Sequence, residues 1–247
     1  FEQMEIEHFC HENSEKIIFD NYLQKIKNFL IEIIGIKESS LKIIDHLKEE
    51  LAHYSLATSD FMFDFPHGWD ELWGLANRGN YDLEVHEKSS KKSLEYLDVE
   101  TREKFLPSVI EPSVGVERLI YAILINSYSE EVVDEKDTRI IMKLNYDLCP
   151  YKICILPLSN KLCKDADKIF KDVLKSNISA TYDGSGSIGK RYRRQDAIGT
   201  NYCVTIDFET IKDSSITIRD RDTMEQIRIS INEFLEDIHK LQFKFNK

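Results

Sequence analysis

A carboxylate, a hydroxyl, a glycine and an arginine lie close together in the segment 111–118, where their types and spacing suit a ligand site. Glu111 ends an apolar run, where an unpaired carboxylate costs free energy unless it meets a cation or strong donors. Ser113 can cap a helix, and Gly115 lets a ligand approach the backbone at the positive end of that helix. Arg118 falls in the first helical turn, where the helix dipole does not favour a cation, so it needs another partner. A capped turn with two surface charges is the plain alternative.

Two elements must position this group. The apolar run 105–110 predicts a buried strand that Pro112 ends, and a helix then begins near Val116. Residues 1–9 alternate as a strand, with three polar side chains between two aromatic ones on one face. That face indicates a lined pocket, although an ordinary solvent-facing strand has the same pattern.

A second group of carboxylates follows a strand predicted at 60–65. Trp69 and Trp73 bracket Asp70 and Glu71. Carboxylates beside large apolar surfaces favour a bound cation such as Mg²⁺ or a shifted pKa. Strand-edge charges under aromatic cover are the alternative. Around this group we expect helices at 14–34, at 41–51 and from Asp82 onwards.

A basic segment follows the glycine-rich loop 183–189 and contains Lys190, Arg191, Arg193 and Arg194. Their mutual repulsion favours a polyanion, and the intervening Tyr192 suits stacking on unpaired bases. The GxxxxGK spacing of a P-loop is met at 184–190, but Arg191 stands where its Ser or Thr belongs, which argues against a nucleoside triphosphatase. A solvated helix paired with Asp183 and Asp196 is the alternative.

From residue 149 onwards strands and helices alternate, which predicts an α/β domain with a largely parallel sheet. We expect strands at 152–158, 179–183, 202–207 and 216–219 and helices at 160–174, 188–197 and 224–239. The predicted domain boundary therefore lies between residues 148 and 149.

Composition excludes several classes of protein. The formal net charge of −11 over 247 residues argues against indiscriminate coating of nucleic acid. No apolar run reaches the roughly 18 to 20 residues that span a bilayer, and no signal peptide is evident, so we expect no membrane partner and a cytoplasmic location. The five cysteines form no CxxC pair, and Cys10, between His8 and His11, lacks a fourth metal ligand. The first residue is not Met, and we expect the C-terminal part of a longer protein.

Several stretches together resemble one family. FEQMEIEHF, from residue 1, resembles the second strand of motif 2 of the class II aminoacyl-tRNA synthetases, and EPSVGVERL, from residue 111, resembles their motif 3. ELAHYSLATSDF and FPHGWDELWGLANRGNYDL resemble blocks of glycyl-tRNA synthetase of the homodimeric type. YDGSGSIGKRYRRQDAIGTNYCVTIDF and TIRDRDTMEQIRI resemble its anticodon-binding domain. The resemblance implies an α+β catalytic domain with an antiparallel sheet at 1–148, C-terminal part only, and an α/β anticodon-binding domain with a mixed, largely parallel sheet at 149–247.

The resemblance also implies a reaction and its site. Glycine is activated by ATP with Mg²⁺, and the glycyl group passes to the 3′ end of tRNA(Gly). The implied glycine-binding residues are Phe1, Glu2, Gln3, Met4, Glu5, Glu111, Pro112, Ser113, Val114 and Gly115. Those for ATP are Phe1, Glu71, Leu72, Gly115, Val116, Glu117 and Arg118, with Glu71 also the magnesium ligand. Those for tRNA are Lys190, Arg191, Arg193 and Arg194, and no general acid or base is implied. Within this set Glu5, Glu111 and Ser113 would hold the glycine ammonium, and Phe1 and Arg118 would enclose the adenine.

One departure and three alternatives remain. Motif 1 and the first strand and loop of motif 2 are not found before Phe1, so we expect these 247 residues alone to form no glycyl-adenylate. A non-catalytic nucleic-acid-binding accessory subunit, like that of the mitochondrial DNA polymerase, shares the synthetase fold. Synthetases for proline, threonine or histidine lack the two glycyl-type blocks. A dinucleotide-binding enzyme would use the GxGxxG spacing at 184–189, but no acidic residue is placed to bind a ribose.

Overall fold

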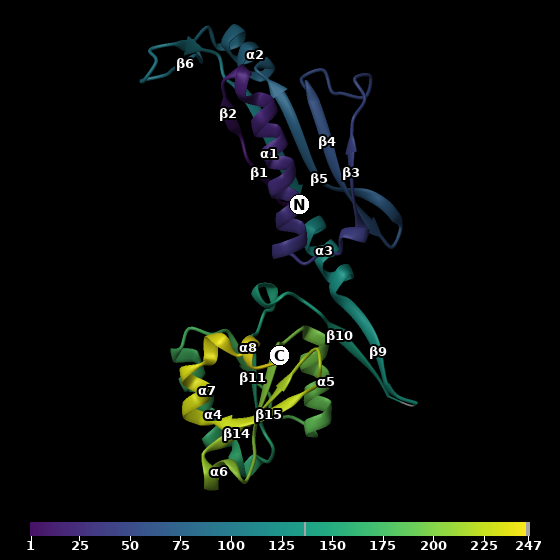
Figure 1. The fold of residues 1–247 in the computed structure, drawn as a ribbon, viewed down its shortest axis with the longest axis vertical. Coiled ribbons are helices and arrows are strands. Elements are labelled where there is room, and N and C mark those ends of the chain that lie inside the picture. Colours follow the sequence, from purple (N-terminus) through teal and green to yellow (C-terminus); the bar gives the residue numbers. More distant parts are fainter. Residues whose placement is uncertain (136, 246–247) are drawn as a thin grey trace. The chain divides into compact units, whose positions relative to one another are not determined.

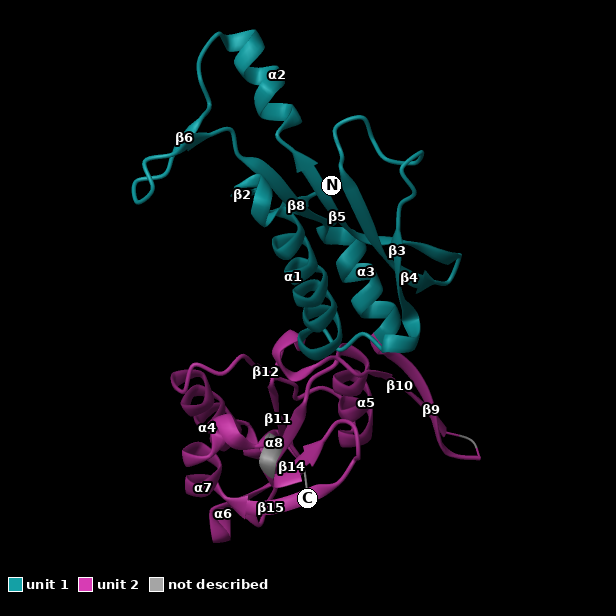
Figure 2. Cartoon of the chain, turned by 45° about the horizontal axis from the view of Figure 1, so that its top comes forward, with its two compact units in different colours: residues 1–126 teal, residues 127–247 magenta. Residues whose placement is uncertain are grey.

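The computed structural model describes residues 1–135 and 137–245, and its contacts divide the chain into two compact units, Phe1–Asn126 and Ser127–Lys247 (Figures 1 and 2). The divide falls before the position predicted at 148–149. The intervening residues form a hairpin of β9 (Tyr128–Asp134) and β10 (Asp137–Met142). Arg139 of β10 is 1% exposed and donates to Asp196 and to the carbonyls of Arg221 and Asp222 in the second unit. These buried bonds tie the hairpin to the second unit, which the charged sequence gave no means of predicting.

The first unit is built on an antiparallel sheet in the order β1–β8–β5–β4–β3, with β2 also paired to β8. Its strands are β1 (Gln3–Glu5), β2 (His8–Cys10), β3 (Leu41–Asp45), β4 (Ala57–Phe65), β5 (Gly68–Gly79) and β8 (Ser108–Gly115). A separate two-stranded ribbon joins β6 (Tyr96–Leu97) to β7 (Lys104–Phe105). The antiparallel sheet agrees with the predicted fold of this part of the chain.

Helices complete the first unit. They are α1 (Glu15–Asn28), which continues as a π-helix at Phe29–Ile33, α2 (Tyr81–Ser90) and α3 (Val116–Ser127). Helix α1 packs on β5 and β8, and it buries Phe19, Ile26 and, through its extension, Leu30. On β4, buried Phe61, Phe63 and Phe65 alternate with polar or less buried residues, so this strand has one buried apolar face. Short 3₁₀ turns lie at Glu12–Ser14 and Glu38–Ser40.

Two predictions in this unit were wrong. The helix expected at 41–51 is instead β3, because the β-branched pair Ile43 and Ile44 lies in a strand paired with β4. The strand expected to stop at Pro112 runs on to Gly115. Pro112 accepts a hydrogen bond at its carbonyl from the Ile6 amide, 3.0 Å away, where the neighbouring edge is interrupted between β1 and β2. Pro112, which has no N–H to donate, therefore faces the gap between β1 and β2, so no hydrogen bond between paired strands is lost.

The second unit holds a mixed sheet in the order β12–β11–β13–β14–β15. Strand β11 (Ile153–Pro157) pairs in parallel with β12 (Ala180–Tyr182) and β13 (Tyr202–Ile206), whereas β14 (Ser215–Asp220) pairs antiparallel with β13 and with β15 (Gln226–Ser230). The sheet is mixed as predicted, but it is not largely parallel, because two of its four strand pairings are antiparallel. The helix expected at 224–239 is in fact β15 followed by α7, because Ile227 and Ile229 alternate with polar residues and Ser230 then caps the helix.

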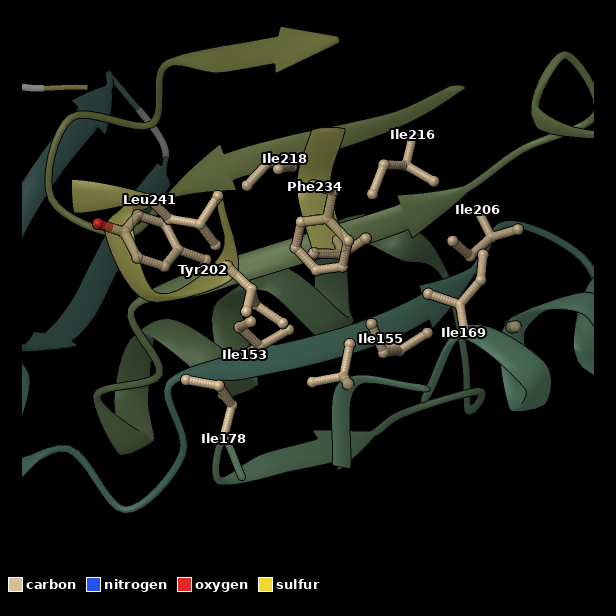
Figure 3. Close-up of a cluster of buried hydrophobic side chains, with 14 residues drawn as sticks. Ile153, Ile155, Ile169, Ile178, Tyr202, Ile206, Ile216, Ile218, Phe234 and Leu241 are labelled. Atoms are coloured by element: carbon tan, nitrogen blue, oxygen red, sulfur yellow. The ribbon is translucent and has the colours of Figure 1, made fainter. Parts of the chain in front are cut away.

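Helices α4 (Cys163–Lys175), α5 (Ile188–Ile198), α6 (Thr210–Asp213), α7 (Ile231–Glu236) and α8 (Gln242–Phe245) accompany this sheet, with 3₁₀ turns at Tyr146–Leu148, Asn160–Leu162 and Ile238–Lys240. The core gathers β-branched side chains of the central strands, Ile153, Ile155, Ile216 and Ile218, around Phe234 of α7 (Figure 3). Each such side chain removed from water contributes roughly 1.5–3 kcal/mol. Among the described residues no helix is long and apolar enough to cross a membrane.

Candidate functional site

A cavity of about 350 Å³ opens in the first unit, where the end of β8 meets β1, β5 and α3. Its lining gathers residues from all four elements: Phe1, Gln3, Glu71, Leu72, Ser113, Gly115, Glu117 and Arg118. Every one of these was expected from the sequence to bind glycine or ATP. Residues separated by more than 110 positions thus meet at one site because β1 pairs with the last three residues of β8.

Glu117 fastens the N-terminal segment at the mouth of this cavity. Both of its carboxylate oxygens accept from the Glu2 amide at 3.0 Å, and the Val116 amide donates to the Glu2 carbonyl at 2.9 Å. The hydrogen bond from the Glu2 amide lowers the pKa of Glu117. Phe1 lies before β1, outside any strand or helix, and is 99% exposed.

Arg118 has the partner that its position demanded. Its Nη2 lies 2.6 Å from Oδ2 of Asp70, and its guanidinium lies 5.8 Å from the centre of the Phe65 ring. The Glu71 amide and then Arg118 lower the pKa of Asp70. Because both side chains of this pair are more than two-fifths exposed, it contributes little to stability and leaves Arg118 available to a ligand.

Glu71 carries the carboxylate on the other wall of the cavity. Burial, followed by the neighbouring Asp60 carboxylate, raises its pKa, while Arg118 opposes that shift. The described residues contain no cluster of three or more His, Cys, Asp or Glu that could hold a metal ion by itself. A cation here would need ligands from a substrate as well.

The residues of β8 that were expected to bind glycine lie alternately on the two faces of the sheet. Glu111, Ser113 and Gly115 are partly exposed, whereas Pro112 and Val114 are buried on the opposite face, and Met4 is the cross-strand partner of Val114. Ser113 does not cap a helix. Its hydroxyl donates instead to Glu5 at 3.4 Å, because the two residues are cross-strand partners.

The cation that Glu111 requires is Arg78, which the sequence did not single out. Nη1 of Arg78 donates to both oxygens of Glu111 at 3.0 and 3.1 Å, and its Nε donates to Asp82 at 2.7 Å. Nearby, partial burial and then Glu111 raise the pKa of Glu7 to about 7. The β5–β8 pairing places Ala76 opposite Glu111, so Arg78 could have been found only by knowing which strands are neighbours.

The basic segment lies in the second unit on α5, beside a cavity of about 680 Å³ whose lining includes Lys190, Tyr192, Arg193, Arg194 and Arg219. Arg194 pairs with Asp183 at 2.7 Å, and Arg193 pairs with Asp137. Lys190 forms an ion pair with none of the described residues. The predicted alternative, a helix whose cations pair with Asp183 and Asp196, therefore holds for Arg194 and Asp183. Lys190, Arg193 and Arg194 all line the cavity.

Arg191 is the exception, because it points inward and is 5% exposed. Its guanidinium donates to the carbonyls of Gly186 and Pro157, which braces the glycine-rich loop against the end of β11. Asp196 is also buried, where it accepts from Arg139 and Arg219 rather than pairing with a surface arginine. These two residues support the helix from inside.

Comparisons with known proteins find similar sequences and a similar fold. Residues 152–241 match the family model of the anticodon binding domain. The chain is 60% identical over 245 residues to a glycine–tRNA ligase of Malacoplasma penetrans, covering 99% of this chain and 52% of that protein. A glycine–tRNA ligase of Geobacillus kaustophilus is 48% identical over 240 residues, with 96% of this chain and 52% of that protein covered. The chain thus spans about half the length of the curated relatives it matches.

Among solved structures, prolyl-tRNA synthetase from Cryptosporidium parvum complexed with L-proline and AMP superposes with a TM-score of 0.69. The identity is 15%, and the match covers 98% of this chain and 50% of that one. The fold is accordingly that of class II aminoacyl-tRNA synthetases, with an antiparallel sheet followed by an anticodon binding domain. Within that class, the chain is a homologue of the glycine–tRNA ligases over nearly its whole length.

Proposed function

We propose that this chain forms part of a glycine–tRNA ligase, which joins the glycine carboxylate to the AMP part of ATP with release of pyrophosphate. The enzyme then transfers the glycyl group to the 3′ end of tRNA(Gly) with release of AMP. The observation that carries the proposal is the convergence of Glu5, Glu111 and Ser113 on one sheet face beside the 350 Å³ cavity. Carboxylates and a hydroxyl are acceptors for an ammonium group, and the cavity is of a size for part of a nucleotide. The homology to glycine–tRNA ligases supports the same assignment.

The proposed roles follow from what each side chain can reach. Glu5, Ser113 and Glu111 bind the ammonium of glycine, while Arg78 holds the Glu111 carboxylate in place. Phe1 and Arg118, on the lining of one cavity, bind the two faces of the adenine. Positioning of this kind and stabilisation of charge supply the catalysis, and no general base is assigned.

Glu71 is a suitable ligand for the Mg²⁺ that accompanies ATP. Magnesium commonly takes one or two protein carboxylates and completes its shell with water and substrate phosphates. Glu71 lines the cavity, is exposed, and forms an ion pair with none of the described residues, so its carboxylate is free for such a role. When bound, the ion would neutralise charge on the phosphate oxygens.

In the second unit we assign tRNA binding to Lys190, Arg193 and Arg194, with Tyr192 as a stacking surface. Arg191 supports their helix from inside. The expected homodimer rests on the resemblance, and the expected cytoplasmic location rests on a sequence without membrane-spanning apolar runs. Both stay predictions.

Glycine-dependent exchange of pyrophosphate into ATP by the full-length protein tests the proposal. We expect exchange with glycine and none with alanine or serine. Glu111→Gln should lose most of the exchange activity. Glu12→Gln should retain it, because Glu12 is exposed and distant from Glu111 in the sequence. Binding of tRNA without any glycine-dependent exchange would support the accessory-subunit alternative instead.

A further inference from the structure

Two side chains, Asp60 and His46, lie near Glu71. Asp60 of β4 is the direct cross-strand partner of Gly74 of β5. Its Oδ2 lies 2.6 Å from Nε2 of His46, and the two side chains are only 15% and 31% exposed. The bond to His46 fixes the carboxylate of Asp60. Its other oxygen, Oδ1, lies 3.7 Å from where a Cβ of Gly74 would stand.

A β-bulge brings Glu71 to the same place. The β4–β5 register pairs Phe61 with Trp73 but Met62 with Glu71, so Leu72 is an extra residue. In a regular strand Glu71 and Gly74 would point to opposite faces, whereas one extra residue turns Glu71 to the face of Gly74. Oε1 of Glu71 accordingly lies 3.3 Å from the same Cβ position. Asp60 and Glu71 therefore flank one bare Cα.

The charges around this glycine do not cancel. The nearest arginine, Arg118, is bound to Asp70, and neither Asp60 nor Glu71 forms an ion pair with a lysine or arginine of the described residues. Two carboxylates on either side of a glycine repel one another. A cation close to both of them would be attracted by both charges and would offset this repulsion. A divalent cation that arrives with a ligand would be attracted by this negative charge.

We propose that Asp60, fixed by His46, is a positioning residue for the ATP site: it turns the Glu71 carboxylate toward the cavity across Gly74 and strengthens the attraction for the divalent cation of ATP. This inference rests on the proposed function of Glu71. It assigns roles to His46, Asp60 and Gly74, none of which lines the cavity.

The first test is the magnesium dependence of the exchange reaction in the full-length protein. Asp60→Asn keeps the shape of the side chain and removes its charge, so we expect the half-saturating Mg²⁺ concentration to rise about five- to tenfold. The KM for glycine should change by less than about twofold, because the ammonium-binding carboxylates are untouched. Asp64→Asn is the matched control, since Asp64 lies on the same strand, is exposed, and should leave the Mg²⁺ dependence unchanged.

Two further variants separate positioning from charge. Gly74→Ala keeps Asp60 but places a methyl group 3.3 Å from Oε1 of Glu71, so it should raise the Mg²⁺ requirement in the same direction. His46→Ala releases Asp60 and should do likewise, whereas His46→Gln can still donate a hydrogen bond to Asp60 and should recover most of the wild-type Mg²⁺ dependence.

Binding of Mn²⁺, followed by electron paramagnetic resonance in the presence of a non-hydrolysable ATP analogue, gives a readout independent of turnover. Asp60→Asn should weaken Mn²⁺ binding by a similar factor, and Asp64→Asn should not. Wild-type Mn²⁺ affinity and Mg²⁺ dependence in folded Asp60→Asn would overturn the inference. A wild-type protein that lacks exchange counts against the proposed function, and the Mn²⁺ measurement then still decides the role of Asp60.

Discussion

Arg78 donates from a single guanidinium nitrogen to both oxygens of Glu111, at 3.0 and 3.1 Å, and thereby joins the end of β5 to the middle of β8. The two side chains are 22% and 14% exposed, so the pair is largely desolvated. Removal of one member of such a pair costs more than the pair itself contributes, because the remaining charge stays buried.

Arg78→Ala should therefore lower the free energy of unfolding by about 2 kcal/mol and raise the KM for glycine, since Glu111 loses its fixed orientation. Denaturant unfolding and glycine titration measure the two effects. Arg102→Ala is the control, because Arg102 is exposed and forms no side-chain ion pair with the described residues. Unchanged stability and KM in Arg78→Ala would contradict the role given to this pair.

Glu7 makes the stability of the protein depend on pH. Its pKa is raised to about 7 by partial burial and by Glu111, so the folded state holds a proton that the unfolded chain releases near pH 4.5. Since the folded state then binds more protons, stability falls as the pH rises from about 4.5 to about 7. The loss is modest because the Glu7 side chain stays exposed.

Glu7→Gln should remove this decline, so that the variant gains stability relative to wild type above pH 7 and shows no gain at pH 4. Unfolding free energies measured across that range check the prediction. Glu12→Gln should follow the wild-type curve, and a parallel offset of Glu7→Gln at every pH would show that the effect is not protonation.

Local pattern was sufficient for the elements whose apolar residues repeat with one clear period. The strand at 152–158 and the helices near Asp82 and at 188–197 are found as β11, α2 and α5. The residue pattern predicted helices at 41–51 and at 224–239, but these segments contain the strands β3 and β15. Pairing with neighbouring strands decides the conformation there, although the composition is helical. Long-range pairing also explains Arg78 and Asp60, since neither carries a motif and each is recognised only opposite its partner strand.

The basic segment shows the same limit in one stretch of sequence. Four cations in five positions look equivalent, yet the helix turns Arg191 inward and leaves Lys190 outward. The spacing of the charges predicts a polyanion site, but it does not predict that Arg191 is the buried cation that stabilises the fold.

Arg191→Ala should lower the free energy of unfolding by about 2–3 kcal/mol, because the carbonyls of Gly186 and Pro157 lose their donor. Thermal and denaturant unfolding of the second unit measure this loss. Lys190→Ala, one position earlier, should leave stability unchanged within about 0.5 kcal/mol. Equal stability of the two variants would contradict the inward role of Arg191.

Lys190→Ala should act on RNA binding instead. We expect weaker binding of tRNA(Gly) and a decrease of about 1 in the slope of log affinity against log salt. A tRNA(Gly) with a changed anticodon serves as the control ligand, and Lys164→Ala on α4 serves as the control variant. An unchanged salt slope would mean that Lys190 is a solvated surface charge.

Gly199 ends α5 in the left-handed conformation, with φ of +83°, which L side chains rarely adopt. A Cβ would lie 2.9 Å from Cδ1 of Leu144 and 3.1 Å from the Met142 carbonyl, so Gly199→Ala adds a steric clash to backbone strain. We expect a loss of about 2–4 kcal/mol. Gly186→Ala is the matched comparison, because its φ of +79° is similar but nothing lies within 4 Å of the added Cβ, and it should lose only about 1 kcal/mol. Denaturant unfolding of both variants measures the difference, and equal losses would mean that backbone conformation alone, rather than close packing against Leu144 and Met142, requires glycine at position 199.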